Sequence, residues 1–305
     1  MLTFNNTQTT DVIPMPKAFS VLSWNIEHLK GKRPDRLFRI VNTIKFENPD
    51  IFALYEVEGK TVYHSLLTEL PGYSFHITEG PQTQEILVAV KHKFTAFFSQ
   101  RVEFKSAYSY LRPGAMLSVR VEGQDYSLMF LHLKSQSTPI GLGIRDVQFA
   151  SIYKLKRKLD KVAVGNQKAN FIVLGDFNTM GMNYSGKKHD IPATAELGRL
   201  DQYLHRKSVG MRRLSKTCPN TWSNGSNSRY PAADLDQVLL SKHLKTRLWH
   251  NKLPVNEGDL SFKSGQSEVD IRGWVDQASI EEQDKWIEGY SDHCYLYFEI
   301  TKTKP

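Results

Sequence analysis

Six short clusters of polar residues lie at the ends of apolar runs in this sequence. They are Asn25-Ile26-Glu27-His28, Glu56-Val57-Glu58, His132, Asp176-Phe177-Asn178, Asp236 and Ser291-Asp292-His293. A polar side chain within a buried strand costs several kcal/mol unless it is paired or binds a cation. Because six such placements need a common explanation, we expect the clusters to meet as one site at one end of the sheets.

The side chains of these clusters are mainly carboxylates, amides and imidazoles. Such donors favour a hard divalent cation, Mg²⁺ or Mn²⁺. The 2 cysteines, Cys218 and Cys294, have no second cysteine nearby, which excludes a disulfide scaffold and a cysteine-based zinc site. Hydrolysis of a phosphodiester needs a cation, groups that transfer protons, and donors that bind phosphate oxygens. The six clusters contain residue types for each of these tasks.

About ten runs of the sequence have strand character and must position these clusters. They are Phe19–Trp24, Asp50–Val57, Tyr73–Thr78, Ile86–Lys91, Ala96–Phe104, Ala115–Val121, Tyr126–Lys134, Asn170–Gly175, Leu235–Ser241 and Cys294–Ile300. Helices are expected at Arg36–Phe46, Thr61–Leu70 and Gln148–Lys161, where apolar residues recur at helical spacing or turn signals end the run. Many short strands with few helices predict two sheets packed face to face with helices outside, an α/β sandwich.

No segment between these elements resembles an interdomain linker, and the sequence has no internal repeat. We therefore expect a flexible leader at residues 1–16 and a single domain at residues 17–305. The polar stretches Asn183–Asn227 and Leu248–Ile287 are expected to be long loops over one rim of the sheets. The sequence shows neither an apolar run long enough for a membrane span nor a secretory signal, so we expect a cytoplasmic protein.

The chain carries 40 Lys and Arg against 32 Asp and Glu, a formal net charge of +8. This balance favours polyanionic partners such as nucleic acid or anionic lipid. The basic residues gather in three runs, at residues 30–39, 154–161 and 206–216. The second run is expected on the solvent face of the helix Gln148–Lys161, although each run taken alone is an ordinary solvated surface.

The order of the motifs along the chain resembles the endonuclease/exonuclease/phosphatase superfamily, whose type fold is the deoxyribonuclease I-like four-layer α/β sandwich. The resemblance is carried by Trp24-Asn25, Glu56, His132, Gly175-Asp176-Phe177-Asn178, Asp236 and Ser291-Asp292-His293. It extends from about Phe19 to Ile300, nearly the whole chain. It implies two packed, mainly antiparallel sheets flanked by helices, and a metal-dependent phosphodiesterase that uses Mg²⁺ or Mn²⁺.

The resemblance also implies which residues bind the metal. Glu56 would bind the catalytic Mg²⁺, and Glu27 matches a position that is a metal-binding acid in some members. Asp292 would complete or adjoin that shell, and Asn25 resembles an amide of the phosphate and metal site. Glu58 stays open as the alternative to Glu56, because the two lie on the same strand face.

The implied catalytic residues are the remaining members of the six clusters. Asp176 and Asn178 would position the attacking water and a phosphoryl oxygen. His293 with Asp236 resembles the family's histidine-aspartate dyad, and His132 fits the place of a second histidine. Which of the two histidines acts as acid and which as base is left unassigned.

Two further charged residues have implied roles around the phosphate. Glu85 resembles an acid that orients the second histidine, and Arg112 resembles an arginine that contacts the phosphate. Trp222 and Trp274 could stack a nucleobase or, as the more common use, pack in the core. The other histidines, His28 among them, lack a partner spacing that would assign them to the site.

The substrate is less well defined than the reaction, because members of the superfamily cleave DNA, RNA, lipids or inositol phosphates. The positive charge favours a nuclease that acts on DNA or RNA through metal-assisted attack of water on phosphorus, and whether it is an endonuclease or an exonuclease stays open. Two alternatives stay open. One is a phosphoesterase acting on a small-molecule or lipid phosphate, and the other is a catalytically silent nucleic-acid-binding module.

Overall fold

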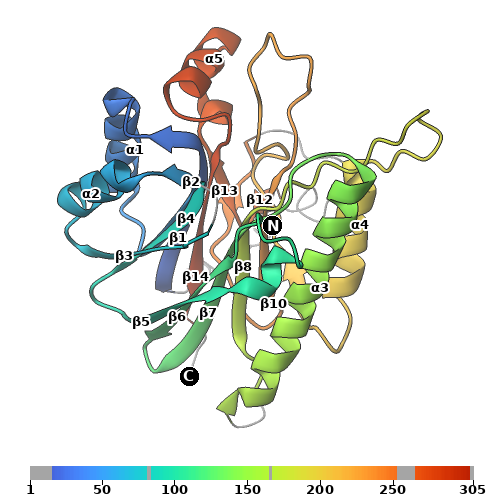
Figure 1. Cartoon of the computed structure of the whole chain (residues 1–305). Coiled ribbons are helices and arrows are strands. Elements are labelled where there is room, and N and C mark those ends of the chain that lie inside the picture. Colours follow the sequence, from blue (N-terminus) through green and yellow to red (C-terminus); the bar gives the residue numbers. More distant parts are fainter. Residues whose placement is uncertain (1–15, 81–83, 165–166, 253–264, 303–305) are drawn as a thin grey trace, which may run out of the picture.

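The computed structural model describes residues 16–80, 84–164, 167–252 and 265–302, so the expected leader lies outside it except for Pro16. A six-stranded sheet forms one half of the centre of the fold (Figure 1). Its order is β13 (Asp270–Arg272), β14 (Tyr295–Thr301), β1 (Lys17–Lys30), β2 (Ile51–Glu58), β4 (Glu85–Lys91) and β3 (Tyr73–Ile77). All neighbours pair antiparallel except β1 and β2, which are parallel.

A second six-stranded sheet packs against the first. Its order is β5 (Thr95–Arg101), β6 (Gly114–Val121), β7 (Gln124–His132), β8 (Asn170–Asp176), β10 (Asp236–Ser241) and β9 (Met211–Arg213). Here the parallel pair is β7 with β8. β11 (Trp249–His250) and β12 (Gln266–Ser267) form a separate two-stranded sheet, and Trp249 packs against Tyr297 of β14.

Helices cover the outer faces of the two sheets (Figure 1). α1 (Pro34–Glu47) and α2 (Lys60–Glu69) pack on the first sheet, and α3 (Pro139–Val162) and α4 (Ala193–Leu204) pack on the second. α5 (Ile280–Gly289) lies at one end of the sandwich in Figure 1. The predicted four-layer α/β sandwich is therefore confirmed.

Both faces of the central strands are buried, and this explains their nearly continuous apolar sequences. Val21 and Ile51 point into the core between the sheets, whereas the adjacent Leu22 and Phe52 pack under the helices of the first sheet. Polar residues cannot be accommodated along the middle of such strands without partners. They are therefore collected at the strand ends, where the predicted clusters lie.

The helix predicted at Gln148–Lys161 begins nine residues earlier than expected, at Pro139. Thr138 caps it, because its side-chain oxygen accepts a hydrogen bond from the Gly141 amide at 3.1 Å. Pro139 occupies the first turn, where its missing N–H is not needed. Gly141 and Gly143 lower helix propensity and concealed this turn in the sequence.

Three other expectations about elements were wrong in part. The strand expected at Ala96–Phe104 ends at Arg101 and continues as a 3₁₀ helix, η1 (Val102–Lys105). The stretch 183–227, expected as a loop, contains α4 and β9. The described part of the stretch 248–287 contains β11, β12, β13, a second 3₁₀ helix η3 (Trp274–Asp276) and most of α5.

The three basic runs are not uniformly solvated. Arg36, Lys156 and Lys216 are buried, so the run on α3 is divided between the solvent and the interior. Lys156 pairs with Asp160 one turn later at 2.5 Å, which compensates its burial. In the described part of the chain, no helix is long and apolar enough to cross a membrane.

Candidate active site

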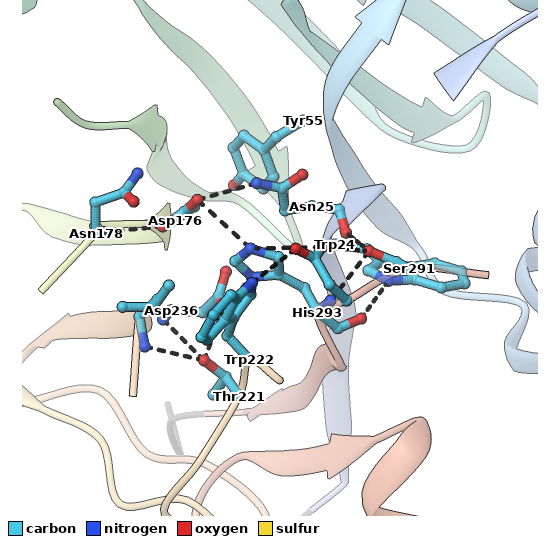
Figure 2. A network of polar contacts seen from close by, with 12 residues as sticks. Trp24, Asn25, Tyr55, Asp176, Asn178, Thr221, Trp222, Asp236, Ser291 and His293 are labelled. Atoms are coloured by element: carbon cyan, nitrogen blue, oxygen red, sulfur yellow. Dashed lines mark hydrogen bonds and ion pairs between the residues drawn. The ribbon is translucent and has the colours of Figure 1, made fainter. Parts of the chain in front are cut away.

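The predicted clusters converge where the two sheets meet at one end of the sandwich (Figure 2). His132, Asp176 and Asp236 are paired neighbours on the adjacent strands β7, β8 and β10. Asn25 on β1 reaches across from the first sheet, and its amide donates to Asp176 Oδ2 at 2.9 Å. The site thus joins residues from both sheets.

His293 and Asp236 form a buried pair. Nδ1 of His293 lies 2.8 Å from Asp236 Oδ2, which leaves Nε2 directed at Asp176 Oδ2, 3.9 Å away. Thr221 supports the pair, since its hydroxyl donates to the same Asp236 oxygen at 2.7 Å. Trp222 donates its indole N–H to Asp292 Oδ2 at 2.7 Å, beside the imidazole (Figure 2). The imidazole therefore has a fixed orientation and one free nitrogen facing the cluster.

Asp176 and Asn178 follow Gly175, a position that has no room for a side chain. Gly175 has φ +134°, and an added Cβ would lie 2.1 Å from the Leu131 carbonyl oxygen and 2.7 Å from the Tyr55 hydroxyl. The close approach of β8 to its neighbours therefore depends on this glycine. Asn178, at φ +52°, donates its backbone N–H to Asp176 Oδ1 at 2.9 Å. Its side-chain amide donates to the Leu133 carbonyl oxygen at 3.2 Å.

The acidic side of the site is built on irregular backbone. Glu56 lies in a register shift between β2 and β4, and Glu27 lies in one between β1 and β2. Both residues have positive φ, +65° for Glu56 and +42° for Glu27. A non-glycine residue in this region costs roughly 1–3 kcal/mol and persists where the surrounding structure enforces it. The bulges turn these carboxylates toward the cluster instead of along the strands.

Arg36 of α1 stabilises the turn after Asn25 through hydrogen bonds. This buried guanidinium donates to the carbonyl oxygens of Ile26 at 2.6 Å, Glu27 at 2.8 Å and Tyr290 at 2.6 Å. Sequence reasoning counted Arg36 as part of a basic surface run, so this function was missed. A basic residue in the first turn of an otherwise apolar helix face was the available signal.

The carboxylates repel one another, and this defines the electrostatics of the acidic side. Burial raises the pKa of the Glu27 carboxyl, and the charges of Asp292 and Glu56 raise it further while Arg36 opposes the shift. Burial also raises the pKa of Asp176, to which the charge of Asp236 contributes. A cation placed among these groups would relieve the repulsion.

The two histidines have opposite electrostatic environments. Burial disfavours the charged form of His293, but the charge and hydrogen bond of Asp236, with Asp176 and Asp292, outweigh it and raise the pKa of His293. Burial lowers the pKa of His132 well below its usual range, and the positive charge of Arg112 adds to this. Because their pKa values are shifted in opposite directions, His293 can be protonated while His132 is neutral.

His132 lies between the two acidic groups, with Nε2 3.6 Å from Asp176 Oδ2 and 3.7 Å from Glu56 Oε1. The predicted orienting contact from Glu85 is not formed. Glu85 Oε2 accepts a hydrogen bond from Thr78 at 2.5 Å, and His132 Nδ1 is buried without a hydrogen-bond partner among the described residues. Glu85 Oε1 is likewise buried without a hydrogen-bond partner among the described residues, so the orienting role of Glu85 remains a prediction.

Arg112 lies close enough to the cluster for Glu56 and Asp176 to act on its charge. Its guanidinium is held by hydrogen bonds to the backbone and side-chain oxygens of Gln84. The position is compatible with the predicted contact to a phosphate, which remains a prediction. Of the two tryptophans that could stack a nucleobase or pack in the core, Trp274 is buried in the core. Trp222 lies beside the site.

His28 contacts the acidic side of the site through its backbone and carries an exposed ring. Its backbone N–H donates to Glu56 Oε2 at 3.0 Å, and its exposed ring lies 2.9 Å from Glu58 Oε1. Glu58 is thus occupied by His28 and Lys30, whereas Glu56 also contacts Asn25 at 3.4 Å. Of the two acids left open by the sequence, Glu56 is the one that belongs to the cluster.

The donor set fits a magnesium ion better than zinc. Among the residues that the structure describes, no three His, Cys, Asp or Glu side chains are grouped closely enough to hold a metal by themselves. Mg²⁺ binds through one or two carboxylates, retains several waters and takes further ligands from a substrate phosphate. Glu56, Glu27 and Asp292 are suitable ligands. Asn25 presents its N–H groups to the carboxylates, because its oxygen accepts from the Glu27 amide at 3.1 Å.

A cavity of about 1180 Å³ opens beside the cluster. Trp222 and Leu235 line the cavity on the side of the cluster. Ala193 and Leu197, at the start of α4, also line it. Residues 222–233 form a second wall, a hairpin closed by the Trp222–Ala233 bridge. A space of this size next to the candidate site accommodates a group larger than a phosphate.

Comparisons with known proteins agree with the fold described above. Residues 22–293 match the sequence profile of the Endonuclease/Exonuclease/phosphatase family. No curated protein matches the chain by sequence.

Among solved structures, truncated TDP2 from Caenorhabditis elegans is 18% identical with a TM-score of 0.61, and the match covers 93% of this chain and 98% of that chain. TDP2 from D. rerio, complexed with single-strand DNA product, is 17% identical with a TM-score of 0.61, covering 93% and 99%. The human Nocturnin catalytic domain with a bound sulfate anion is 17% identical with a TM-score of 0.57, covering 93% and 94%. At these identities the structures share the fold.

Proposed function

Because the chain belongs to the Endonuclease/Exonuclease/phosphatase family, we propose that it is a Mg²⁺-dependent phosphodiester hydrolase that cleaves nucleic acid. The observation that carries the proposal is the position of His293. Its free Nε2 faces Asp176 at 3.9 Å and Asp292 at 4.0 Å, while Asp236 fixes the opposite nitrogen. An oriented imidazole beside clustered carboxylates is the arrangement that general acid/base catalysis next to a cation requires.

Glu56, with Glu27 or Asp292 as a second carboxylate and with waters and a phosphate oxygen as the other ligands, would hold the Mg²⁺. When bound, the ion supplies positive charge to the phosphate oxygens. Bulged backbone aims Glu56 and Glu27 into the cluster, so their orientation does not depend on flexible loops. Trp222 holds Asp292 through its indole N–H. The acidic side is therefore built before a substrate arrives, which lowers the cost of organising it during the reaction.

The other side of the site would bind and orient the reacting groups. His293 keeps a proton on Nε2 and stabilises negative charge on the phosphate. Asp176, held by Asn25 and by the Asn178 amide, accepts a hydrogen bond from the attacking water and so orients it. Burial keeps His132 neutral, and its Nε2 faces Asp176 and Glu56.

Nucleic acid is the substrate class that the chain supports best. The net charge of +8 favours a polyanion, and the cavity beside the cluster offers space for the nucleoside next to a scissile phosphate. Structures of the same fold include a TDP2 in complex with single-strand DNA product, which supports the assignment by analogy.

The substrate class can be tested by incubating the purified protein with plasmid, single-stranded DNA, RNA and bis-p-nitrophenyl phosphate, with and without EDTA. We expect EDTA-sensitive cleavage of at least one polymer and of the small ester. Cleavage of the small ester alone would replace the nuclease by a small-molecule phosphoesterase. Binding of nucleic acid without cleavage of any substrate would indicate a silent binding module.

A further inference from the structure

Arg145 is a fully buried arginine in the second turn of α3, on the outer side of the second sheet. An arginine has five N–H donors in a rigid planar fork. Here each one has an acceptor. Nε and one Nη2 proton bind the two carboxylate oxygens of Glu196 at 2.6 and 3.0 Å, and the others bind the carbonyl oxygens of Lys134, Gln136 and Gly181 at 3.2, 2.8 and 2.8 Å.

The three carbonyl acceptors lie in the segments that follow β7 and β8, the strands that end at His132 and Asp176. Lys134 lies two residues after His132 at the end of β7, and Gly181 lies three residues after Asn178, beyond β8. Glu196 completes the connection from α4, because its Oε2 also accepts the Gly181 backbone N–H at 2.8 Å. One ion pair thus joins both strand exits to α3 and α4.

The same two segments are also tied together within the active site. Leu133 accepts a hydrogen bond from the Asn178 side chain at 3.2 Å and donates its backbone N–H to the Asp176 carbonyl oxygen at 2.9 Å. The separation of His132 from Asn178 is therefore set from two sides, by these direct contacts and by the buried guanidinium. With no exposed surface, Arg145 cannot itself touch a substrate.

We propose that Arg145 and Glu196 are a positioning pair that sets the relative placement of His132 and Asn178. This inference rests on the proposed phosphodiester hydrolysis, in which His132 and Asn178 are part of the site. Displacement of a reacting group by about 1 Å can reduce turnover by about 100-fold even when the substituted residue lies away from the chemistry. A residue with this role affects kcat far more than KM.

The chain provides a matched control in the same helix. Lys156 and Asp160 form another buried ion pair of α3 at 2.5 Å, but they contact Ala169 at the start of the β8 region instead of the strand exits. The test compares Arg145→Lys and Glu196→Gln with Lys156→Arg and Asp160→Asn. The measurements are the thermal midpoint, kcat and KM on bis-p-nitrophenyl phosphate per folded molecule, and the ring-nitrogen NMR signals of His132.

We expect Arg145→Lys and Glu196→Gln to reduce kcat by about 10- to 100-fold with KM within about threefold, and to move the His132 ring signals. Lys156→Arg and Asp160→Asn should lower the thermal midpoint and leave kcat within about twofold, with unchanged His132 signals. If the first two variants unfold at room temperature, the measurements are made in the cold with trimethylamine N-oxide, which favours the compact state.

Equal losses of kcat in both pairs, or normal kcat and unmoved His132 signals in the Arg145 and Glu196 variants, would overturn the positioning role. A wild-type protein that hydrolyses no phosphodiester would instead overturn the proposed function. In that case the NMR comparison still decides whether the pair places His132.

Discussion

His293 Nδ1 lies 2.8 Å from Asp236 Oδ2, although 57 residues separate the two in the sequence. Asp236 is the first residue of β10, and His293 precedes β14 of the other sheet, so the pair also connects the two sheets. Both side chains are nearly inaccessible to solvent. A buried imidazole with a fixed orientation and one nitrogen directed at carboxylates is costly to maintain without a function.

Substitution of His293 by Ala, or of Asp176 by Ala, should reduce turnover by at least about 100-fold, because each removes a group that orients water or stabilises charge. Asp236→Asn should give a loss of similar size, since the amide lacks the negative charge that keeps a proton on the imidazole and it can stabilise the wrong tautomer. The measurement is kcat on bis-p-nitrophenyl phosphate. His243→Ala is the control, because this exposed histidine contacts Asn170 at the opposite end of β8. Near-wild-type turnover in the His293 or Asp176 variant would refute the assignment.

Glu56→Gln should raise the Mg²⁺ concentration that gives half-maximal activity by about 10-fold or more, because a ligand charge is lost. Glu58→Gln, two residues later on the same strand, should change it by less than about threefold, since Glu58 contacts His28 and Lys30 instead. A Mg²⁺ titration of both variants measures the difference. The reverse order would assign the metal to Glu58.

Gly175→Ala should destabilise the fold by about 2 kcal/mol or more and abolish activity, because its Cβ would collide with the Leu131 carbonyl oxygen and the Tyr55 hydroxyl. Gly72→Ala is the matched control, as nothing lies within 4 Å of the Cβ that it would add. Urea unfolding of the two variants gives the comparison. Equal stabilities would show that β8 does not need a glycine at this position.

The stability of the protein should depend on pH through Asp50. Burial opposes ionisation of this carboxyl, but hydrogen bonds from Lys93 and the Ser20 amide, with the charge of Lys91, outweigh it and lower the pKa of Asp50. A group with a lowered pKa in the folded state stabilises the fold above its unfolded pKa, about 3.9 for Asp, and this contribution is lost as the pH falls through the folded pKa.

Asp50→Asn should therefore cost about 2 kcal/mol of unfolding free energy near neutral pH, and the difference from wild type should shrink below about pH 4. Denaturant unfolding at several pH values measures this. Asp125→Asn serves as the control, because the Asp125 side chain is 77% exposed. A wild-type advantage that stays constant down to about pH 2 would contradict the assigned direction.

The sequence predicted which side chains meet in the candidate site, because the chemistry limits which residue types can be used and in which order. The sequence predicted that His293, Asp236, Asp176 and His132 would meet. In the structure successive contacts link them, with 2.8 Å between His293 and Asp236, 3.9 Å between His293 and Asp176, and 3.6 Å between His132 and Asp176. The four-layer fold was predictable for a similar reason. Strands that are buried on both faces have nearly continuous apolar sequences. Polar residues therefore accumulate at the strand ends.

What the sequence did not predict depends on backbone irregularities. His28 joins Glu56 only because β1 shifts register after Asn25, and no local pattern in the sequence marks that shift. Nothing in the sequence indicated that Thr78 would donate a hydrogen bond to Glu85. Arg36 was read as surface charge because its partners are backbone carbonyls, which the sequence does not reveal.

The central claim, hydrolysis of a phosphodiester at a carboxylate and imidazole cluster that needs a divalent ion, is tested most directly by metal removal. Bis-p-nitrophenyl phosphate hydrolysis would be measured in protein stripped with EDTA, then after addition of Mg²⁺ or Mn²⁺, in wild type and in His293→Ala. We predict no hydrolysis without metal, recovery in the wild type on addition of either ion, and little recovery in the variant. Undiminished hydrolysis in EDTA, or equal recovery in His293→Ala, would contradict the account.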